Sequence, residues 1–284
     1  MKLLAVLPVV LFVLMLGFAA ESSAVGISID AGLTPPQGRW ILRTQVRSMS
    51  RTAPEGTTDA AMDRIMVPLV VVHGLRPQLT LGLRQIIDSR SMTMMGQENK
   101  ESGFGDLYVF AKYKILRINT RNYTLGIAPL LGVEAPTGSS GISNEFWSLN
   151  TGLFISGRAG KWGADLSLGY RFSGVAKVPA DSPDPGNETG LNLALARQIP
   201  VGGSSRTALA PVLEISWAST AADKDGGIET PNSGESVFTL APGLKYTRGD
   251  LIIEGLVRFP VSQDQKGMQM EIGNMYLLGV RHMF

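Results

Sequence analysis

The last nine residues of the chain decide the fold, and they read Tyr276-Leu277-Leu278-Gly279-Val280-Arg281-His282-Met283-Phe284. Counted back from Phe284, every second side chain can face lipid, whereas the intervening positions include Arg281. Successive side chains of a β-strand point to opposite faces of a sheet. The stretch therefore predicts a strand with one face toward hydrocarbon and the other toward a polar interior.

The start of the chain predicts a secretory leader. Lys2 supplies a positive charge, residues 3–18 are mainly apolar, and Ser22-Ser23-Ala24 offers the small residues that a cleavage site requires. We expect cleavage after Ala24, so that residues 1–24 are a signal peptide. An uncleaved anchor helix is the alternative, and the short apolar run with Pro8 argues against it. No Cys is present, which excludes a lipoprotein.

Composition narrows the class of protein. The 284 residues allow one large β domain or two ordinary ones. The absence of cysteine fits an oxidising compartment. Because the net charge is only +2, we expect no nucleic-acid partner.

Any membrane crossing must use strands. Beyond the leader, the longest purely apolar stretch is residues 65–72, which includes Pro68 and is too short for a membrane helix. A membrane strand needs only about 9 to 11 residues. Barrels of this kind alternate long loops on one side of the membrane with short turns on the other.

Breaker-rich segments of two lengths alternate along the chain, after a first strand at residues 39–49. The long ones are residues 50–61, 91–103, 135–144, 173–187, 219–234 and 263–270, and the short ones are residues 74–78, 116–122, 158–161, 200–205 and 247–250. They join about twelve strands, an even number that places both termini in the periplasm. We predict an all-β, transmembrane antiparallel up-and-down β-barrel over residues 37–284. Residues 25–36 form a periplasmic tail or a short plug, and the tail is the favoured interpretation.

The charged residues assign the faces of the strands. Arg or Lys near the middle of the lipid face costs about 2 to 4 kcal/mol, so the charged parity must face the lumen. In the first strand, Trp40 and Val46 then face lipid, while Arg43, Gln45 and Arg47 face inward. Only residues 64–73 resist this assignment. Aromatic residues gather near both ends of the strands, as expected at two membrane interfaces but not in a soluble sandwich.

The same parity yields a set of candidate pore-lining residues. They are Arg43, Arg47, Arg84, Asp106, Lys112, Lys114, Glu134, Asp165, Arg171, Glu214, Lys245, Glu254, Arg258 and Arg281. With Asp88 they make nine cations and six acids, while the inward positions of the middle strands are small. We favour a narrow aqueous passage over the alternative, a lumen plugged by ion pairs.

Four segments carry a family resemblance: Thr34-Pro35-Pro36-Gln37-Gly38-Arg39-Trp40, residues 73–82, residues 105–113 and Val133-Glu134-Ala135-Pro136-Thr137-Gly138. They resemble the outer-membrane family labelled "putative meta-pathway of phenol degradation". The resemblance implies a transporter-like barrel that takes up small aromatic or hydrophobic compounds. His73 departs from the pattern, since a tyrosine is expected there. The final Phe284 resembles the carboxyl-terminal signal read by the barrel-insertion machinery.

These observations predict a channel in the outer membrane of a Gram-negative bacterium for passive passage of small solutes. A closed structural or adhesion barrel acting through its extracellular loops is the alternative. We expect no enzyme, because His73 lies near a periplasmic turn and His282 has the lipid-facing parity, away from any nucleophile at the outer rim. We expect no cofactor and no metal, since the acidic loop at Asp223 lacks a complete set of calcium ligands. Outer-membrane lipid and a small-molecule solute are the expected partners, and the barrel is expected to be a monomer.

Overall fold

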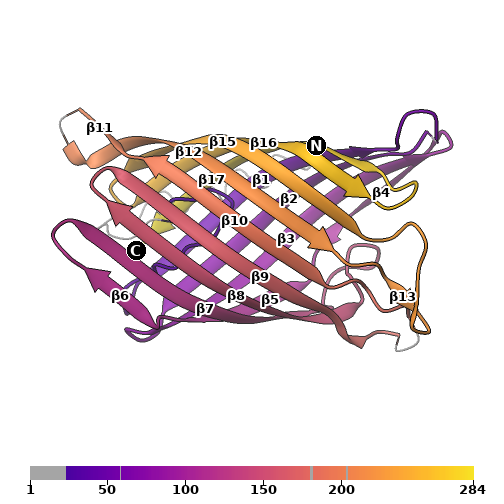
Figure 1. Cartoon of the computed structure of the whole chain (residues 1–284), viewed down its shortest axis with the longest axis horizontal. Helices are drawn as coiled ribbons and strands as arrows, with labels where there is room; N and C mark the ends of the chain where they lie inside the picture. The colour runs from indigo at the N-terminus through magenta and orange to yellow at the C-terminus, as the bar shows by residue number, and fades with distance from the viewer. Residues whose placement is uncertain (1–23, 58, 180–181, 203) are drawn as a thin grey trace.

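The computed structural model describes residues 24–284 except residues 58, 180, 181 and 203 (Figure 1). The predicted signal peptide lies outside the described residues apart from Ala24. Within the described part of the chain, no helix is long and apolar enough to cross a membrane.

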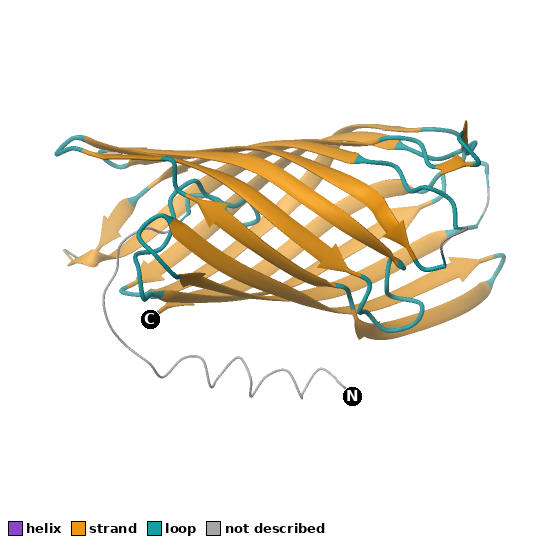
Figure 2. Cartoon of the chain, turned by 90° about the horizontal axis from the view of Figure 1, so that it is seen from below, coloured by secondary structure: helices purple, strands orange, loops and turns teal. Residues whose placement is uncertain are grey.

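The fold is a closed antiparallel barrel of twelve strands whose strands cross it at a tilt (Figures 1 and 2). The wall contains β1 (Trp40–Thr52), β2 (Ala61–Gly74), β3 (Leu79–Met94), β4 (Gln97–Phe104), β5 (Leu107–Tyr113), β6 (Leu116–Asn119), β7 (Tyr123–Ala135), β8 (Phe146–Ala159), β9 (Trp162–Lys177), β10 (Glu188–Arg197), β11 (Ile199–Val201), β12 (Ser204–Thr220), β15 (Glu235–Arg248), β16 (Leu251–Gln265) and β17 (Glu271–Met283). The segments β4, β5 and β6 share one position in the wall, and so do β10 and β11. A small hairpin, β13 (Lys224–Asp225) with β14 (Ile228–Glu229), lies in the loop after β12.

The first and last strands close the barrel. β1 pairs with β17, with Thr44 opposite Val280, and β10 pairs with β12, with Asn192 opposite Ser216. Closure leaves no sheet edge, so the backbone N–H and C=O groups are paired between strands, as hydrocarbon requires. The predicted fold class is confirmed.

The two faces of the wall differ as the parity predicts. On the outer face Val109, Leu168 and Leu278 are 47%, 51% and 71% exposed, whereas Asp165 and Leu277 point inward and are buried. The unassigned residues 64–73 follow the same rule. Ile65 is exposed on the outer face, while Arg64 pairs with the buried Asp88 inside.

Several predicted connections are shorter in the structure, as two examples show. Residues 91–103 are not a loop, because β3 and β4 continue as a hairpin that turns at Met95 and Gly96, both with positive φ. Beyond the membrane both faces of a strand meet water, so polar composition there resembles a loop. The predicted turn at residues 116–122 is shorter, since β6 pairs with β7 and only residues 120–122 connect them.

A charge on the outer face tests the membrane placement. Leu168 lies near the middle of β9. Leu168→Arg is therefore expected to destabilise the barrel in lipid vesicles, lowering its free energy of unfolding by about 2 to 4 kcal/mol. The matched control is Val175→Arg, because Val175 is equally exposed but lies near the loop end of β9. It should cost about 0 to 1 kcal/mol. Urea titration followed by heat-modifiable gel mobility measures both, and equal losses would contradict this placement.

Candidate functional site

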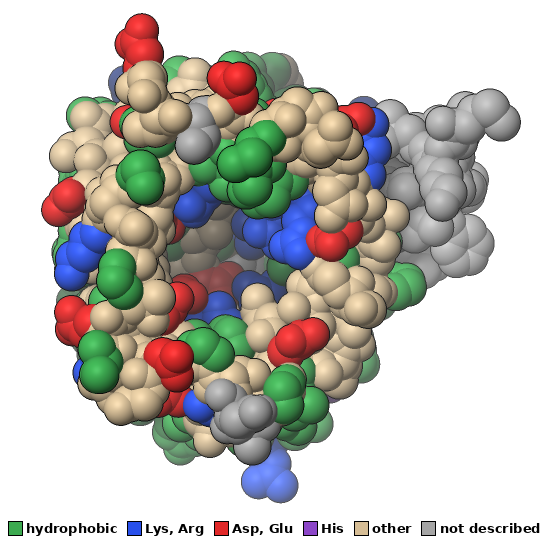
Figure 3. Space-filling view, turned by 90° about the vertical axis from the view of Figure 1, so that its right-hand side faces the viewer, with side chains coloured by type: hydrophobic (Ala, Val, Ile, Leu, Met, Phe, Trp, Pro, Cys, Tyr) green, Lys and Arg blue, Asp and Glu red, His purple; other side chains and the backbone are tan. Residues whose placement is uncertain are grey.

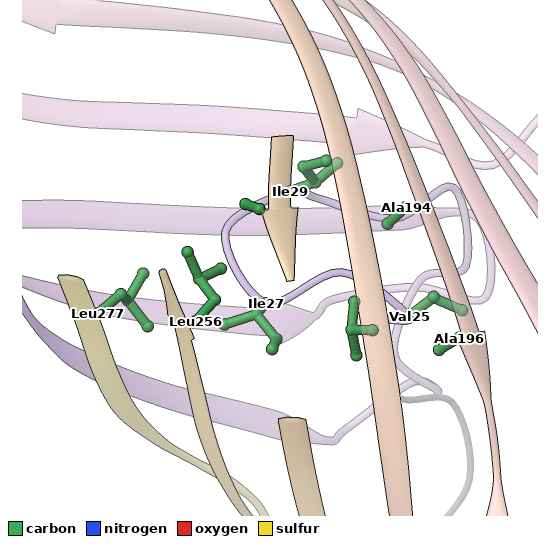
Figure 4. Packing of buried hydrophobic residues seen from close by; sticks show 9 residues of the cluster. Val25, Ile27, Ile29, Ala194, Ala196, Leu256 and Leu277 are labelled. Carbon is green, nitrogen blue, oxygen red and sulfur yellow. The ribbon is translucent and has the colours of Figure 1, made fainter. Parts of the chain in front are cut away.

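Residues 24–36, here called the inner segment, lie inside the barrel. Val25, Ile27 and Ile29 are at most 5% exposed, and they pack with wall residues of β10, β16 and β17 (Figure 4). The favoured prediction, that this segment is a periplasmic tail, is therefore wrong, because the segment lies in the lumen. The reason is that three apolar side chains at alternate positions are buried, while the backbone between them is bound by polar wall residues.

The small wall residues give the inner segment its room. Ala194, Ala196 and Ala241 are buried in the same apolar cluster as Ile27 and Leu256. The sequence predicts that small inward residues leave empty space in the lumen. On this side of the barrel the inner segment fills that space instead.

Two buried carboxylates bind the backbone N–H groups of the inner segment. Ile27 N and Ser28 N donate to Oε1 of Glu214 over 2.6 and 2.8 Å, and Val25 N donates to Oδ2 of Asp165 over 2.6 Å. Glu214 and Asp165 are 1% and 0% exposed. Hydrogen bonds to an ionised acceptor are stronger than neutral ones, so these contacts hold the segment firmly.

Polar wall side chains bind the carbonyl groups of the same segment. Lys245 Nζ donates to the carbonyl oxygen of residue 24 over 2.5 Å, and Gln45 Nε2 donates to that of residue 27 over 2.8 Å. Arg281 and Lys112 donate to those of residues 26 and 31 over 3.3 and 3.2 Å. The wall thus replaces the water that an extended backbone would otherwise bind.

Asp30 gives the inner segment a side-chain ion pair as well. Its Oδ2 lies 3.0 Å from Nζ of Lys112. The side chain of Asp30 is 47% exposed to the lumen, and the surrounding wall desolvates the rest of it, which raises its pKa; the charges of Lys112, Arg43 and Arg281 outweigh this effect and hold the pKa of Asp30 below its ordinary value. Asp30 is therefore ionised at neutral pH and attracted to the cationic side of the wall.

Further ion pairs surround the inner segment. Glu254, 1% exposed, lies 3.3 Å from Nε of Arg43 and 3.0 Å from Nη2 of Arg281, and it also accepts a hydrogen bond from Gln45. Arg258 lies 3.7 Å from Glu214 and donates to the Ser28 hydroxyl over 2.5 Å. Because the buried carboxylates of Glu254 and Glu214 each have a cation beside them, the wall can accommodate them in its interior.

The extracellular mouth is hollow and carries charges of both signs (Figure 3). Glu134 lies 3.0 Å from Arg84 and 2.9 Å from Arg171. The guanidinium of Arg84 also covers the ring of Tyr108, 4.6 Å from its centroid. Arg47 differs from these cations, since it donates only to Gln45 Oε1 and has no carboxylate within ion-pair distance among the described residues.

Two of the predicted pore-lining residues have other surroundings. Asp106 accepts hydrogen bonds from Gly138 N, Ser143 Oγ and Asn144 N over 2.7 to 2.9 Å, so it holds the loop at residues 136–145. Lys114 follows the end of β5 beside the periplasmic turn. The other twelve predicted residues either contact the inner segment or lie in the lumen, as described above.

A cavity of about 870 Å³ opens on the periplasmic side of the inner segment. Its lining includes Leu33 of that segment, Val70 and Phe110 of the wall, and the cations Arg43 and Lys112. Glycines of two short turns, Gly160 and Gly249, also line it, which places it in the periplasmic half.

An aromatic group of side chains lies at one wall of the lumen. Tyr108, Phe110 and Leu130 are buried together, and Phe154 packs against them. Lys112 Nζ lies 4.3 Å from the ring centroid of Phe154, within cation–π distance. The sequence analysis did not identify this cluster, and the inward parity of Phe154 on β8 is the signal that could have located it.

Both histidines are stacked on aromatic rings near the periplasmic end of the wall. His73 lies 4.0 Å from the ring of Trp40, and His282 lies 5.8 Å from that of Phe284. Within the described ranges, no three His, Asp or Glu side chains are grouped so as to hold a metal ion.

Comparisons with known proteins agree with this architecture. The family model described as "Putative MetA-pathway of phenol degradation" matches residues 55–260, more than half of the chain. No curated protein matches it. Among solved structures, the COG4313 outer membrane channel from Pseudomonas putida F1 is similar, with a TM-score of 0.70, 16% identity, and coverage of 90% of this chain and 100% of that one.

Two other barrels are similar to a lesser degree. The β domain of the Bordetella autotransporter BrkA has a TM-score of 0.50 at 14% identity, and covers 88% of this chain and 100% of its own. The NanC porin has a TM-score of 0.45 at 14% identity, and covers 84% and 98%. The fold and its apolar outer band place the chain in the bacterial outer membrane.

Neutralising Glu214 tests how the inner segment is held. Glu214→Gln keeps the size of the side chain but removes the charge that binds two backbone N–H groups, and each such bond contributes about 1.5 to 3 kcal/mol. We expect the segment to leave the lumen in many more molecules, so that planar bilayers record longer openings or a larger conductance. The control is Glu235→Gln, because Glu235 pairs with Arg51 near the loop end of its strand. Unchanged conductance in Glu214→Gln would contradict this role.

Proposed function

We propose that this chain, which belongs to the family described as "Putative MetA-pathway of phenol degradation", is an outer-membrane channel for passive passage of small solutes, aromatic or hydrophobic compounds among them. The observation that carries the proposal is the division of the lumen. A hollow opens at the extracellular mouth, a cavity of about 870 Å³ opens toward the periplasm, and the inner segment lies between them.

The inner segment is a removable obstacle in this proposal. It enters from the periplasmic end, where residues 37–39 join it to β1, and the contacts described between residues 24–36 and the other strands are noncovalent. The wall carboxylates that bind it can be hydrated when it leaves. Passage then requires movement of a short peptide and no change in the barrel.

The lumen favours solutes that combine an apolar ring with an acidic group. Phe110 and Lys112 both line the cavity, and Nζ of Lys112 lies 5.9 Å from the ring centroid of Phe110 and 4.3 Å from that of Phe154. Arg47 adds a positive charge without a carboxylate partner in the described structure. Cationic walls attract anions, and aromatic rings pack against one another in offset or edge-on arrangements.

We further propose that the barrel works as a monomer. Phe284 ends the last strand, its N–H donates to Trp40 O, and its ring is partly exposed at the periplasmic rim. That position suits recognition by the barrel-insertion machinery.

Bilayer recordings test passage directly. Purified protein is expected to give discrete conductance steps, and Arg47→Glu should shift the reversal potential in a salt gradient toward cation selectivity. Reversal at Arg47 breaks no ion pair, so the barrel should fold normally. Arg121→Glu, on an exposed periplasmic turn, is the control and should leave selectivity unchanged. Silent bilayers with correctly folded protein would overturn the channel and favour a closed barrel acting through its extracellular loops.

The solute class is tested by current block. Benzoate should reduce the ion current at a lower concentration than acetate, because only benzoate places a ring against Phe110 and Phe154. The double variant Phe110→Leu/Phe154→Leu should remove this difference. Phe172→Leu is the matched control, since Phe172 is 41% exposed on the outer face. Equal block by the two anions in the unaltered protein would reject the aromatic preference while leaving the channel itself intact.

A further inference from the structure

We propose that removal of the leader creates a binding partner for the barrel wall: the new α-ammonium of Val25 is held by the buried carboxylate of Asp165. The observations are independent of transport. Val25 is the residue after the predicted cleavage site, and its backbone nitrogen already lies 2.6 Å from Asp165 Oδ2.

Asp165 is built to receive a cation at this position. Its side chain is 0% exposed, and its other oxygen accepts a hydrogen bond from Ser156 Oγ over 2.6 Å. Arg158 lies 2.9 Å from the same oxygen, Oδ1. One oxygen thus serves the wall, and the other, Oδ2, binds the inner segment at Val25 N and, over 3.3 Å, Gly26 N.

The wall is also shaped around Val25. Its side chain is 5% exposed within the apolar cluster, and a Cβ atom at Gly163 would come within 2.5 Å of its Cγ2. Only glycine at position 163 leaves room for this side chain. The position of the nitrogen is therefore set by packing as well as by the hydrogen bond.

The chemical step is hydrolysis of the peptide bond between Ala24 and Val25 by the leader peptidase. The oxygen of water bonds to the carbonyl carbon of Ala24, which leaves with the leader as a carboxylate. The bond between that carbon and the nitrogen of Val25 breaks, and the nitrogen takes up both protons of the water and becomes an ammonium. An amide that donates one hydrogen bond is thereby replaced by a charged group with three donors at the same site.

Lys245 does not compete with this ammonium for Asp165. Lys245 Nζ donates to the carbonyl oxygen of residue 24, which cleavage removes, and it has no carboxylate within ion-pair distance in the described part of the chain. Lys245 is 4% exposed and lines the cavity of about 870 Å³. Hydrogen bonds between two charged groups are the shorter and stronger kind, so processing strengthens the attachment of the inner segment.

The first measurement is the amino-terminal sequence of the protein purified from outer membranes. It should begin at Val25. A start at any other residue would overturn the proposal, because the ammonium would then lie elsewhere.

The second measurement is the reactivity of the α-amine of the folded barrel in detergent toward an aldehyde reagent specific for α-amines. We expect the unaltered protein to react slowly until it is unfolded by heat, and Asp165→Asn to react about tenfold faster, as loss of one charge-assisted hydrogen bond implies. Asp88→Asn is the control, because Asp88 is 2% exposed and paired with Arg64 but does not touch the inner segment. Fast reaction of the unaltered protein, or no difference between the two variants, would overturn the proposal.

An insertion variant distinguishes loss of the contact between the α-ammonium and Asp165 from a general loss of stability. One Ala placed between Ala24 and Val25, with cleavage before the insert, moves the ammonium one residue away from Asp165 while every wall residue stays the same. The amine of this variant should react as fast as that of Asp165→Asn, while heat-modifiable gel mobility stays normal. An inserted chain as unreactive as the unaltered protein would show that Asp165 does not select the position of the amine, and would overturn the proposal.

Discussion

The arrangement of the lumen depends on the hydrogen bonds that the backbone of the inner segment donates to Glu214 and Asp165. A peptide without regular structure cannot enter a barrel unless its N–H and C=O groups find partners there. The wall supplies carboxylates that accept from the N–H groups. Lys245, Gln45 and Arg281 donate to the C=O groups. The same polar wall side chains that a channel needs for solutes therefore bind a segment of its own chain.

Charge pairing explains why the wall can hold so many ionised groups. Glu254 is almost completely buried, and a carboxylate there would be costly without Arg43 and Arg281 beside it. Glu134 is held in the same way by Arg84 and Arg171. These pairs fix rows of side chains on neighbouring strands around the lumen.

The sequence predicts the barrel well and its contents poorly, for a physical reason. The facing of side chains depends on a repeat of two residues and on the high cost of charge in lipid. Both are local properties, so the outward facing of Val46 and the inward facing of Gln45 are predicted correctly. The hairpin of β3 and β4 extends into water, where no face must be apolar, and its polar residues resemble a loop. The inner segment depends on contacts across more than a hundred residues, such as Ile27 with Glu214, and no local pattern reports them. The alternation of Val25, Ile27 and Ile29 is the one local pattern that indicates burial of the segment. It is too short to distinguish a buried segment from a periplasmic tail.

The balance of forces on the inner segment suits a reversible obstacle. Burial of an aliphatic side chain contributes about 1.5 to 3 kcal/mol, and an ordinary hydrogen bond exchanged with water contributes only about 0.5 to 1.5 kcal/mol. Against these gains stands about 1 to 2 kcal/mol of backbone entropy for each ordered residue. The segment orders residues 24–36 but buries only Val25, Ile27 and Ile29 as large aliphatic side chains in the wall cluster. The gains and the cost are thus of similar size, and the charged contacts at Glu214, Asp165 and Lys112 decide which of them is larger.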